Sequence, residues 1–312
     1  MDNINTILKE NYNLDVINVV PQKGGWASLA YKVFTDEHVY FLKVYEKDRA
    51  STEKWTALID EYMPILFWLL QNSCLKDKIV VPIWTINGNY KCEDEKGIYI
   101  VYEYIVGETI GDRDLTEEQI EQLSHIITEL HSYGGEIPQI TNGIKEDFTI
   151  PYLQKLRYLF IDENHTMPDD IREVIDPYME QITNWMDELE RLSISLKKRN
   201  LKMVLCHTDI HNWNLMQSQK QLMLIDWEGL ILAPAEADMI FFVKKPYYDK
   251  FLSIYQKTHR YFKINPDALL FYQIKRKLED VWEFSEQLLF DQQNNHDRAE
   301  TLDNLSKELS NL

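Results

Sequence analysis

Residues 203–242 carry the pattern that most limits what this chain can fold into and do. His207 and Asp209 are followed closely by Asn214, and Asp226 comes 17 residues after Asp209. Each half of the stretch contains an apolar run that predicts a strand, with an acid where the strand gives way to a polar loop. Two carboxylates and an amide on adjacent loops supply the oxygen ligands that Mg²⁺ prefers. The stretch therefore predicts a compact site that binds a metal ion and orients a hydroxyl group.

The composition is that of a folded, acidic protein. Of the 312 residues, 45% are hydrophobic and 12% are aromatic, and the formal net charge is −18. This charge argues against a nucleic-acid partner, because phosphate backbones select basic surfaces, and it is compatible with a cationic small molecule. The three cysteines show no C-x-x-C spacing, so they predict neither a disulfide framework nor a zinc site.

The chain shows no pattern typical of secretion or membrane insertion. Residues 1–15 lack the basic start and apolar core of a signal peptide. The longest apolar stretches, such as residues 63–70, are far too short to span a bilayer. We therefore expect a soluble, cytoplasmic protein with no membrane partner.

The first third of the chain has the pattern of a small lobe that mixes strands with one helix. Strands are expected at residues 16–20, 30–34, 39–45, 79–86 and 97–105, and a helix at residues 51–72. Gly24 and Gly25 fall in the turn between the first two strands, and Lys43 falls on the third. Pro64 predicts a kink or a break in the helix, because proline cannot donate the backbone hydrogen bond that a helix needs.

The rest of the chain is predicted to be mostly helical. Helices are expected at residues 116–133, 150–160, 168–197, 247–262, 267–290 and 299–310. Thr116 and Gln119 have the spacing of a capping box at the start of the first of these helices. The change in character at Val106-Gly107 predicts a boundary between residues 1–106 and residues 107–312. The motifs and the resemblance described below imply that the first is a nucleotide-binding lobe and the second a helical catalytic and acceptor-binding lobe. The fold class is therefore α+β with two lobes.

The residues of the opening stretch match the needs of phosphoryl transfer. That reaction asks a protein mainly to position its reactants and to compensate charge on the transferring group. Asp209 would accept or orient the acceptor hydroxyl, and Asn214 and Asp226 would hold the metal ions that bridge the donor phosphates. His207 is expected to orient its loop by hydrogen bonds rather than to take part in the chemistry.

Phosphoryl transfer also asks for a lysine on a strand, which reaches the donor phosphates and is held by an acid on a nearby helix. Lys43 has the setting for the first role. Glu61 is the expected partner acid, and Glu53 is the alternative.

These motifs occur in an order that resembles the eukaryotic-protein-kinase-like fold. More closely, the chain resembles the aminoglycoside phosphotransferase and choline kinase group over residues 15–290, and residues 205–238 are most similar to spectinomycin-type antibiotic phosphotransferases. The stretches that carry the resemblance are Gly24-Gly25, Leu42-Lys43, residues 102–107, residues 207–214 and Ile225-Asp226-Trp227.

The resemblance implies a role for each matching residue. Asp209 would be the catalytic base, Asn214 and Asp226 the Mg²⁺ ligands, and Lys43 the lysine that binds phosphate. ATP or GTP would be the donor. Asp238 matches a family acid that is expected to brace the catalytic loop.

The purine and the phosphates would meet backbone groups of the small lobe. The resemblance makes Glu103, Tyr104 and Ile105 the hinge segment that contacts the purine edge. The phosphate loop departs from the G-x-G-x-x-G pattern and keeps only Gly24 and Gly25, whose amides could contact phosphates, while the nearby Ser28 could add a hydroxyl.

The acceptor is predicted from the acids and aromatic residues of the second lobe. Four acids could meet ammonium groups and one tryptophan could stack on a sugar or cover a cation: Glu228, Glu236, Asp280, Glu283 and Trp282. The main hypothesis is a Mg²⁺-dependent kinase for a cationic, sugar-like compound such as an aminoglycoside or aminocyclitol antibiotic. A metabolic kinase for choline, methylthioribose, a fructosamine or a similar hydroxyl compound is the alternative. A nucleotide-binding regulator without catalysis is a further alternative.

Overall fold

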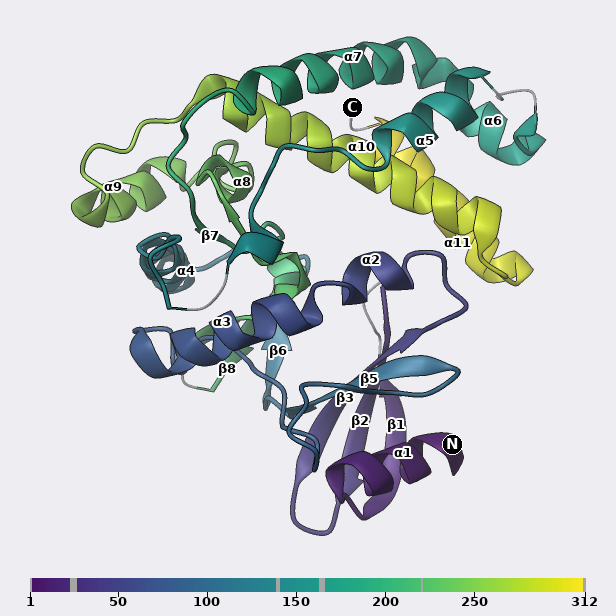
Figure 1. The fold of residues 1–312 in the computed structure, drawn as a ribbon, viewed down its shortest axis with the longest axis vertical. Helices are drawn as coiled ribbons and strands as arrows, with labels where there is room; N and C mark the ends of the chain where they lie inside the picture. The colour runs from purple at the N-terminus through teal and green to yellow at the C-terminus, as the bar shows by residue number, and fades with distance from the viewer. Residues whose placement is uncertain (1, 23–26, 139–140, 163–165, 220, 311–312) are drawn as a thin grey trace.

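The computed structural model describes residues 2–22, 27–138, 141–162, 166–219 and 221–310. The chain folds into a small lobe built on an antiparallel sheet and a larger lobe made mostly of helices (Figure 1). The predicted α+β class and its two-lobed arrangement are therefore confirmed. No described helix is long and apolar enough to cross a membrane.

The small lobe contains a five-stranded antiparallel sheet with the strand order β1-β2-β3-β5-β4. Its strands are β1 (Val16–Gln22), β2 (Leu29–Thr35), β3 (Val39–Glu46), β4 (Cys92–Glu93) and β5 (Gly97–Glu103). Three helices accompany the sheet: α1 (Asp2–Tyr12), α2 (Thr52–Thr56) and α3 (Ile59–Asn72).

The two faces of the sheet pack against different helices, and this decides where Lys43 points. Leu42 and Val44 share a buried cluster with residues of α1. Tyr45 belongs to the other cluster, which contains the apolar face of α3 and continues into the large lobe. Since successive side chains of a strand alternate between faces, Lys43 lies on the same face as Tyr45, toward the large lobe.

Three details of the small lobe differ from the prediction. Residues 79–86 form no strand and contribute only an isolated bridge between Pro82 and Tyr102. The predicted helix does break, but at residues 57–58, and Pro64 lies inside α3. Helix α1 was not predicted. Gly24 and Gly25 lie outside the described residues, so their predicted role in the turn stays a prediction.

The large lobe is built from eight α-helices in the described part of the chain (Figure 1). They are α4 (Glu117–Leu130), α5 (Leu153–Arg157), α6 (Asp169–Ile175), α7 (Met179–Leu196), α8 (Glu236–Met239), α9 (Tyr248–Thr258), α10 (Pro266–Phe290) and α11 (Asn295–Ser310). Thr116 and Gln119 form the predicted capping box. The predicted helix at 168–197 is divided by a 3-10 turn that contains Pro177, which explains the break.

Two small sheets in the large lobe hold the segments that carry the opening motif. One pairs β7 (Val204–Cys206) with β10 (Ile231–Ala233), and the other has the order β6-β8-β9, with β6 (Gly107–Thr109), β8 (Leu215–Ser218) and β9 (Leu222–Leu224). The segment after β7 leads to Asp209, and the segment after β9 leads to Asp226. Both loops therefore leave sheets that are buried in the same core.

Candidate functional site

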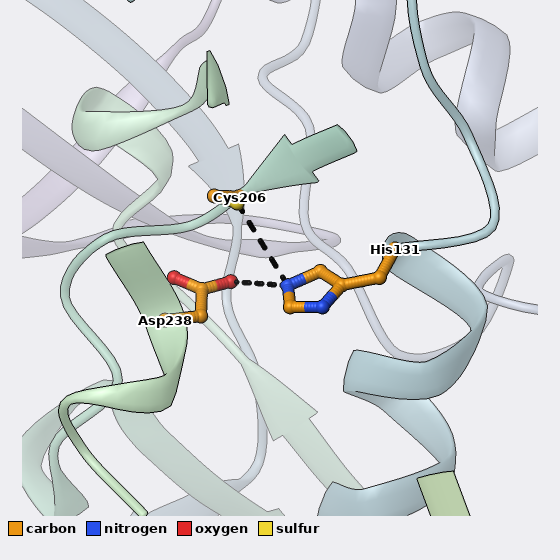
Figure 2. A group of neighbouring side chains, drawn as sticks. All are labelled: His131, Cys206 and Asp238. Atoms are coloured by element: carbon orange, nitrogen blue, oxygen red, sulfur yellow. Dashed lines mark hydrogen bonds and ion pairs between the residues drawn. The ribbon is translucent and has the colours of Figure 1, made fainter. Parts of the chain in front are cut away.

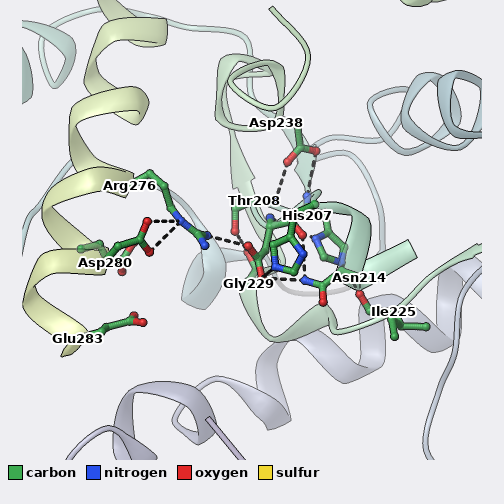
Figure 3. A network of polar contacts seen from close by, with 12 residues as sticks. His207, Thr208, Asn214, Ile225, Gly229, Asp238, Arg276, Asp280 and Glu283 are labelled. Atoms are coloured by element: carbon green, nitrogen blue, oxygen red, sulfur yellow. Dashed lines mark hydrogen bonds and ion pairs between the residues drawn. The ribbon is translucent and has the colours of Figure 1, made fainter. Parts of the chain in front are cut away.

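The loop that carries Asp209 is held in place by Asp238 of α8 (Figure 3). The two carboxylate oxygens of Asp238 accept hydrogen bonds from the backbone amides of His207 at 3.0 Å and Thr208 at 2.6 Å. Asp238 is fully buried, so these bonds to a carboxylate are strong. They hold Thr208 in a left-handed conformation with φ of 68°, which a β-branched residue adopts only when its surroundings impose it.

The loop packs closely against the residue that follows the second acidic motif. The hydroxyl of Thr208 donates to the carbonyl oxygen of Gly229 at 2.9 Å. A Cβ atom at residue 229 would come within 2.5 Å of this hydroxyl and 2.9 Å of the His207 carbonyl oxygen. Only glycine fits at this position, because the two loops meet there.

His207 joins the two loops through both nitrogens of its ring. Its Nδ1 accepts from the backbone amide of Asp209 at 3.2 Å, so the proton resides on Nε2, which donates to the carbonyl of Ile225 at 2.9 Å. The ring also meets Trp227 edge-on, with centroids 4.7 Å apart. His207 is fully buried and thereby ties the position of Asp209 to that of Asp226.

Behind this loop, His131 of α4 makes a second contact with Asp238 (Figure 2). Its Nε2 lies 3.0 Å from Asp238 Oδ2, and its Nδ1 lies 2.9 Å from the hydroxyl of Tyr255. Cys206 is adjacent, and the three side chains are types that ligate metals. Burial raises the pKa of the Cys206 thiol well above its usual range, so it is neutral and a poor metal ligand. This group is a hydrogen-bonded brace.

Asp209 is held by donors on both of its carboxylate oxygens. Asn214 Nδ2 donates to Oδ2 at 2.8 Å, with His211 Nε2 at 3.3 Å from the same oxygen. Arg276 Nη1 of α10 donates to Oδ1 at 2.7 Å. Burial alone would raise the pKa of Asp209, but the hydrogen bond from His211 and the charge of Arg276 outweigh burial and lower it. Asp209 is therefore an ionised carboxylate.

Asn214 and Asp226 lie on neighbouring segments of the β8–β9 hairpin. The backbone amide of Ile225 donates to the carbonyl oxygen of Asn214 at 3.0 Å. Asp226 has a φ of 64°, a strained conformation that turns the chain at the end of β9. Asn214 Nδ2 donates to Asp209, so Asn214 Oδ1 is the atom that could bind a metal ion. An amide oxygen and a carboxylate oxygen so arranged fit Mg²⁺, which prefers oxygen ligands.

Lys43 reaches across from the small lobe to the loop after β9. Its Nζ lies 2.9 Å from Asp226 Oδ1 and 2.5 Å from Glu228 Oε1, and the hydroxyl of Tyr45 donates to the same Glu228 oxygen. Burial would lower the pKa of Lys43, but the two carboxylates raise it well above its usual range. Lys43 is therefore a buried, permanently charged cation beside the predicted metal ligands.

The acid that holds Lys43 differs from the predicted one. In this structure Glu228 of the 3-10 turn at 227–229 pairs with Lys43, whereas Glu61 of α3 and Glu53 of α2 are exposed. Glu61 instead lies against the backbone at Gly143. The sequence could not distinguish these acids, because Glu228 is far from Lys43 along the chain. Glu228 was predicted to contact the acceptor; its carboxylate here contacts Lys43 and Tyr45, and the acceptor contact stays a prediction.

The predicted hinge lies between the last long strand of the small lobe and the first strand of the large lobe. Glu103 ends β5, and Tyr104 and Ile105 connect it to β6. The amide of Tyr104 is already bonded to the carbonyl of Val39 at 3.1 Å. Ser28 is buried just before β2. The contacts of these residues with a nucleotide remain predictions.

Three acids of α10 face the site and each has an internal cation as a partner. Asp280 accepts from Arg276 Nε at 3.1 Å, while Glu279 and Glu283 both pair with Lys54 of α2. Burial raises the pKa of Asp280 to about 6 and that of Glu283 to about 7, against the opposing effect of these cations. The α10 carboxylates thus border Asp209 through Arg276 (Figure 3).

Two predicted acceptor residues, Glu236 and Trp282, are buried and make structural contacts, and their contact with the acceptor stays a prediction. Glu236 accepts from the backbone amide of Asn265 at 2.8 Å and so fixes the loop before α10. Trp282 is only 4% exposed and belongs to the large apolar core. It points inward because α10 is a long helix that buries one face along most of its length.

Sequence reasoning found Lys43 but missed two other cations that contact acids near the site. Arg276 and Lys54 contact Asp209 and the α10 acids, but neither belongs to a motif. One signal was present, because Arg276 and Asp280 have the i,i+4 spacing that pairs opposite charges on one helix face. That spacing identifies the pair but gives no indication that its arginine reaches Asp209.

Comparisons with known proteins agree with this geometry. Residues 18–269 match a family model described as the phosphotransferase enzyme family. A crystal structure of a spectinomycin phosphotransferase with ADP and spectinomycin superposes with a TM-score of 0.75 at 22% identity, covering 98% of this chain and 93% of that one. A microcompartment-associated aminopropanol kinase gives a TM-score of 0.62 at 14% identity, with 99% of this chain and 95% of that one covered.

An amicoumacin kinase in complex with AMP-PNP and Ca²⁺ gives a TM-score of 0.60 at 15% identity, with 99% of this chain and 93% of that one covered. Curated protein sequences gave no match. The solved structures share the kinase-like fold, and the family model spans most of the chain. The chain therefore belongs to the phosphotransferase enzyme family.

Proposed function

We propose that this protein transfers the γ-phosphate of ATP or GTP to a hydroxyl group of a small molecule in a Mg²⁺-dependent reaction. The observation that carries the proposal is the convergence of Asp209, Asn214, Asp226 and Lys43 around one point between the lobes. Each residue has the side chain that phosphoryl transfer needs at that place.

In the proposed mechanism Asp209 orients the acceptor hydroxyl toward the γ-phosphate and accepts its hydrogen bond. The low pKa of Asp209 favours orientation over early removal of the proton. Lys43 holds the donor phosphates, and Asn214 and Asp226 would hold Mg²⁺. When bound, the ion compensates charge on the phosphates. Positioning and charge compensation supply most of the rate enhancement in this class of reaction.

The nucleotide is proposed to lie between the two lobes. The segment Glu103 to Ile105 would meet the purine edge with its backbone, and Gly24, Gly25 and Ser28 would cover the phosphates. Lys43 supports this placement, because it comes from the small lobe and its charge is directed at the large-lobe loop. Nucleotide complexes of structurally similar proteins, with ADP or AMP-PNP, are consistent with it.

The acceptor is proposed to be a cationic, sugar-like compound such as an aminoglycoside or aminocyclitol antibiotic. Asp280 and Glu283 support this class, since they are carboxylates near Arg276 and could accept ammonium groups. The spectinomycin complex of the similar phosphotransferase supports it by analogy of fold.

A metabolic kinase for choline, methylthioribose, a fructosamine or another hydroxyl compound is the second candidate. The similarity to an aminopropanol kinase favours it, since that neighbour is named for a small amino alcohol. A regulator without catalysis is disfavoured, because such a protein need not retain Lys43, Asp209, Asn214 and Asp226 together.

The test is a panel of acceptors assayed for phosphate transfer with Asp209→Ala as the defining variant. We expect Mg²⁺-dependent transfer by the unaltered protein and a loss of about 10³-fold or more in kcat for Asp209→Ala, with nucleotide affinity changed little. Asp297→Ala, on exposed α11, is the matched control. Full turnover by Asp209→Ala would overturn the mechanism. Transfer to antibiotics alone would favour the first candidate, and transfer to amino alcohols alone would favour the second.

A further inference from the structure

The geometry points to Arg276 as a positioning residue for Asp209. This inference rests on the proposed function, because it assigns Arg276 a part in the same reaction. Arg276 lies on α10, and its Nη1 donates to Asp209 Oδ1 at 2.7 Å (Figure 3). We infer that Arg276 fixes the direction of the Asp209 carboxylate and links it to the acceptor side of the site.

Arg276 is itself held in place from two directions. Its Nε donates to the carboxylate of Asp280, one helical turn further along α10, at 3.1 Å. Its guanidinium lies 6.0 Å from the centroid of the Phe241 ring, within the range of a cation–π contact. A planar guanidinium with fixed neighbours loses little freedom when it donates a further hydrogen bond, so it is a precise tether for a carboxylate.

The contact leaves Asp209 able to receive an acceptor hydroxyl. A carboxylate oxygen accepts more than one hydrogen bond, and Arg276 supplies one donor to Oδ1. Asp209 keeps 29% of its side chain exposed. Asn214 holds the other oxygen, so the carboxylate is fixed on both sides while part of the side chain stays exposed. This is the arrangement of an orienting base rather than of a blocked one.

The same arginine connects the base to the acids that are proposed to meet the acceptor. Asp280 and Asp209 are bridged by one guanidinium, and Glu279 and Glu283 act on it through their charges. An acceptor that binds beside Asp280 therefore contacts the group that positions the base. Loss of Arg276 should accordingly lower kcat more than it raises the KM for nucleotide.

The experiment compares Arg276→Gln and Arg276→Lys with the unaltered protein. Removal of a charged hydrogen-bond donor should lower kcat by about 10- to 100-fold and leave the nucleotide KM within about 2-fold. In crystal structures the Asp209 carboxylate should keep a single orientation in the unaltered protein and take more than one in Arg276→Gln. Arg276→Lys keeps the positive charge but not the planar guanidinium group, so it should restore kcat only in part.

Lys277→Gln is the matched control, since it removes a cation from the next position of α10, where the ammonium lies 4.9 Å from the Trp185 ring centroid. Thermal unfolding of each variant checks that the fold is kept. An unchanged kcat together with an unchanged orientation of the Asp209 carboxylate in Arg276→Gln would overturn the inference. The orientation of the carboxylate can be compared without an acceptor, so its loss in Arg276→Gln supports the inference even if the protein phosphorylates no compound and the proposed function fails.

Discussion

Two lysines of the small lobe each bridge to a pair of acids in the large lobe, yet their surroundings differ. Lys43 of β3 pairs with Asp226 and Glu228, and its side chain is 11% exposed. Lys54 of α2 pairs with Glu279 and Glu283, and its side chain is 36% exposed. The first cluster lies at the loop that carries the predicted metal ligands, and the second lies at the edge of the lobes between α2 and α10.

The difference shows that an ion pair between lobes is not by itself a sign of catalysis. Lys43 projects from the middle of a sheet, and Tyr45 two residues on supports the same glutamate. Lys54 projects from a helix of five residues and can be screened by solvent, so its pairs stabilise the closed arrangement of the lobes only modestly. The transfer of phosphate should therefore depend on the first cluster, whereas the second should affect stability and, through Glu283, the binding of the acceptor.

The largest effect is expected for Lys43→Ala. The substitution removes the cation that is proposed to hold the donor phosphates and leaves Glu228 buried without its partner. We expect kcat/KM to fall by about 10²- to 10³-fold, measured as phosphate transfer at saturating acceptor. Lys47→Ala is the control, because Lys47 follows β3 and pairs with the more exposed Glu93. Equal activities of the two variants would remove the distinction between the clusters.

A smaller effect is expected for Glu228→Gln, which keeps the shape of the side chain and removes its charge. Lys43 would retain Asp226 as a partner at 2.9 Å, so the lysine should keep its position but be held by one ion pair instead of two. We expect kcat/KM to fall by about 10-fold, with stability lower by about 1–2 kcal/mol. Glu61→Gln and Glu53→Gln are the controls, since each was predicted from sequence to hold the lysine. A larger loss in either control than in Glu228→Gln would restore the helix acid as the partner.

The fold and the residues of the reaction differ in how far sequence could predict them. The two-lobed α+β fold followed from strand periodicity, from the helical stripes and from the order of motifs. The sequence identified Asp209, Asn214 and Asp226 because they lie close together along the chain, next to predicted strands. At such short separations, spacing along the chain still determines distance in space. The helix at residues 116–133 could also be predicted, since the two residues of its capping box are close together in the sequence.

The parts that sequence could not predict depend on contacts between distant segments. Glu228 was known as an acid, but only the folded arrangement of β3 against the loop after β9 makes it the partner of Lys43. Arg276 reaches Asp209 only because α10 crosses the large lobe beside the loop that carries Asp209. The strand expected at residues 79–86 failed for a related reason, since apolar alternation there reflects packing beside β5 without continuous pairing.

The smallest expected effect concerns the pH dependence of the free energy of unfolding, to which the two clusters contribute with opposite sign. Burial raises the pKa of Glu283 to about 7, whereas Lys43 outweighs burial and lowers the pKa of Glu228. Between about pH 4.5 and 7 the carboxyl of Glu283 is ionised in the unfolded chain and neutral in the folded one, so its contribution to the free energy of unfolding falls as pH rises. Glu228 behaves oppositely, since its contribution is present above its unfolded pKa and is lost as pH falls.

Glu283→Gln should therefore flatten the decline in stability between about pH 4.5 and 7, by about 1–3 kcal/mol across that window, measured by denaturant unfolding at several pH values. Glu228→Gln should remove stability at neutral pH and little at low pH. Glu118→Gln, on the exposed side of α4, should leave the profile parallel to that of the unaltered protein. If Glu283→Gln and Glu228→Gln changed the profile in the same direction, the two lysine clusters would be electrostatically equivalent, and the contrast between a catalytic pair and a stabilising pair would be lost.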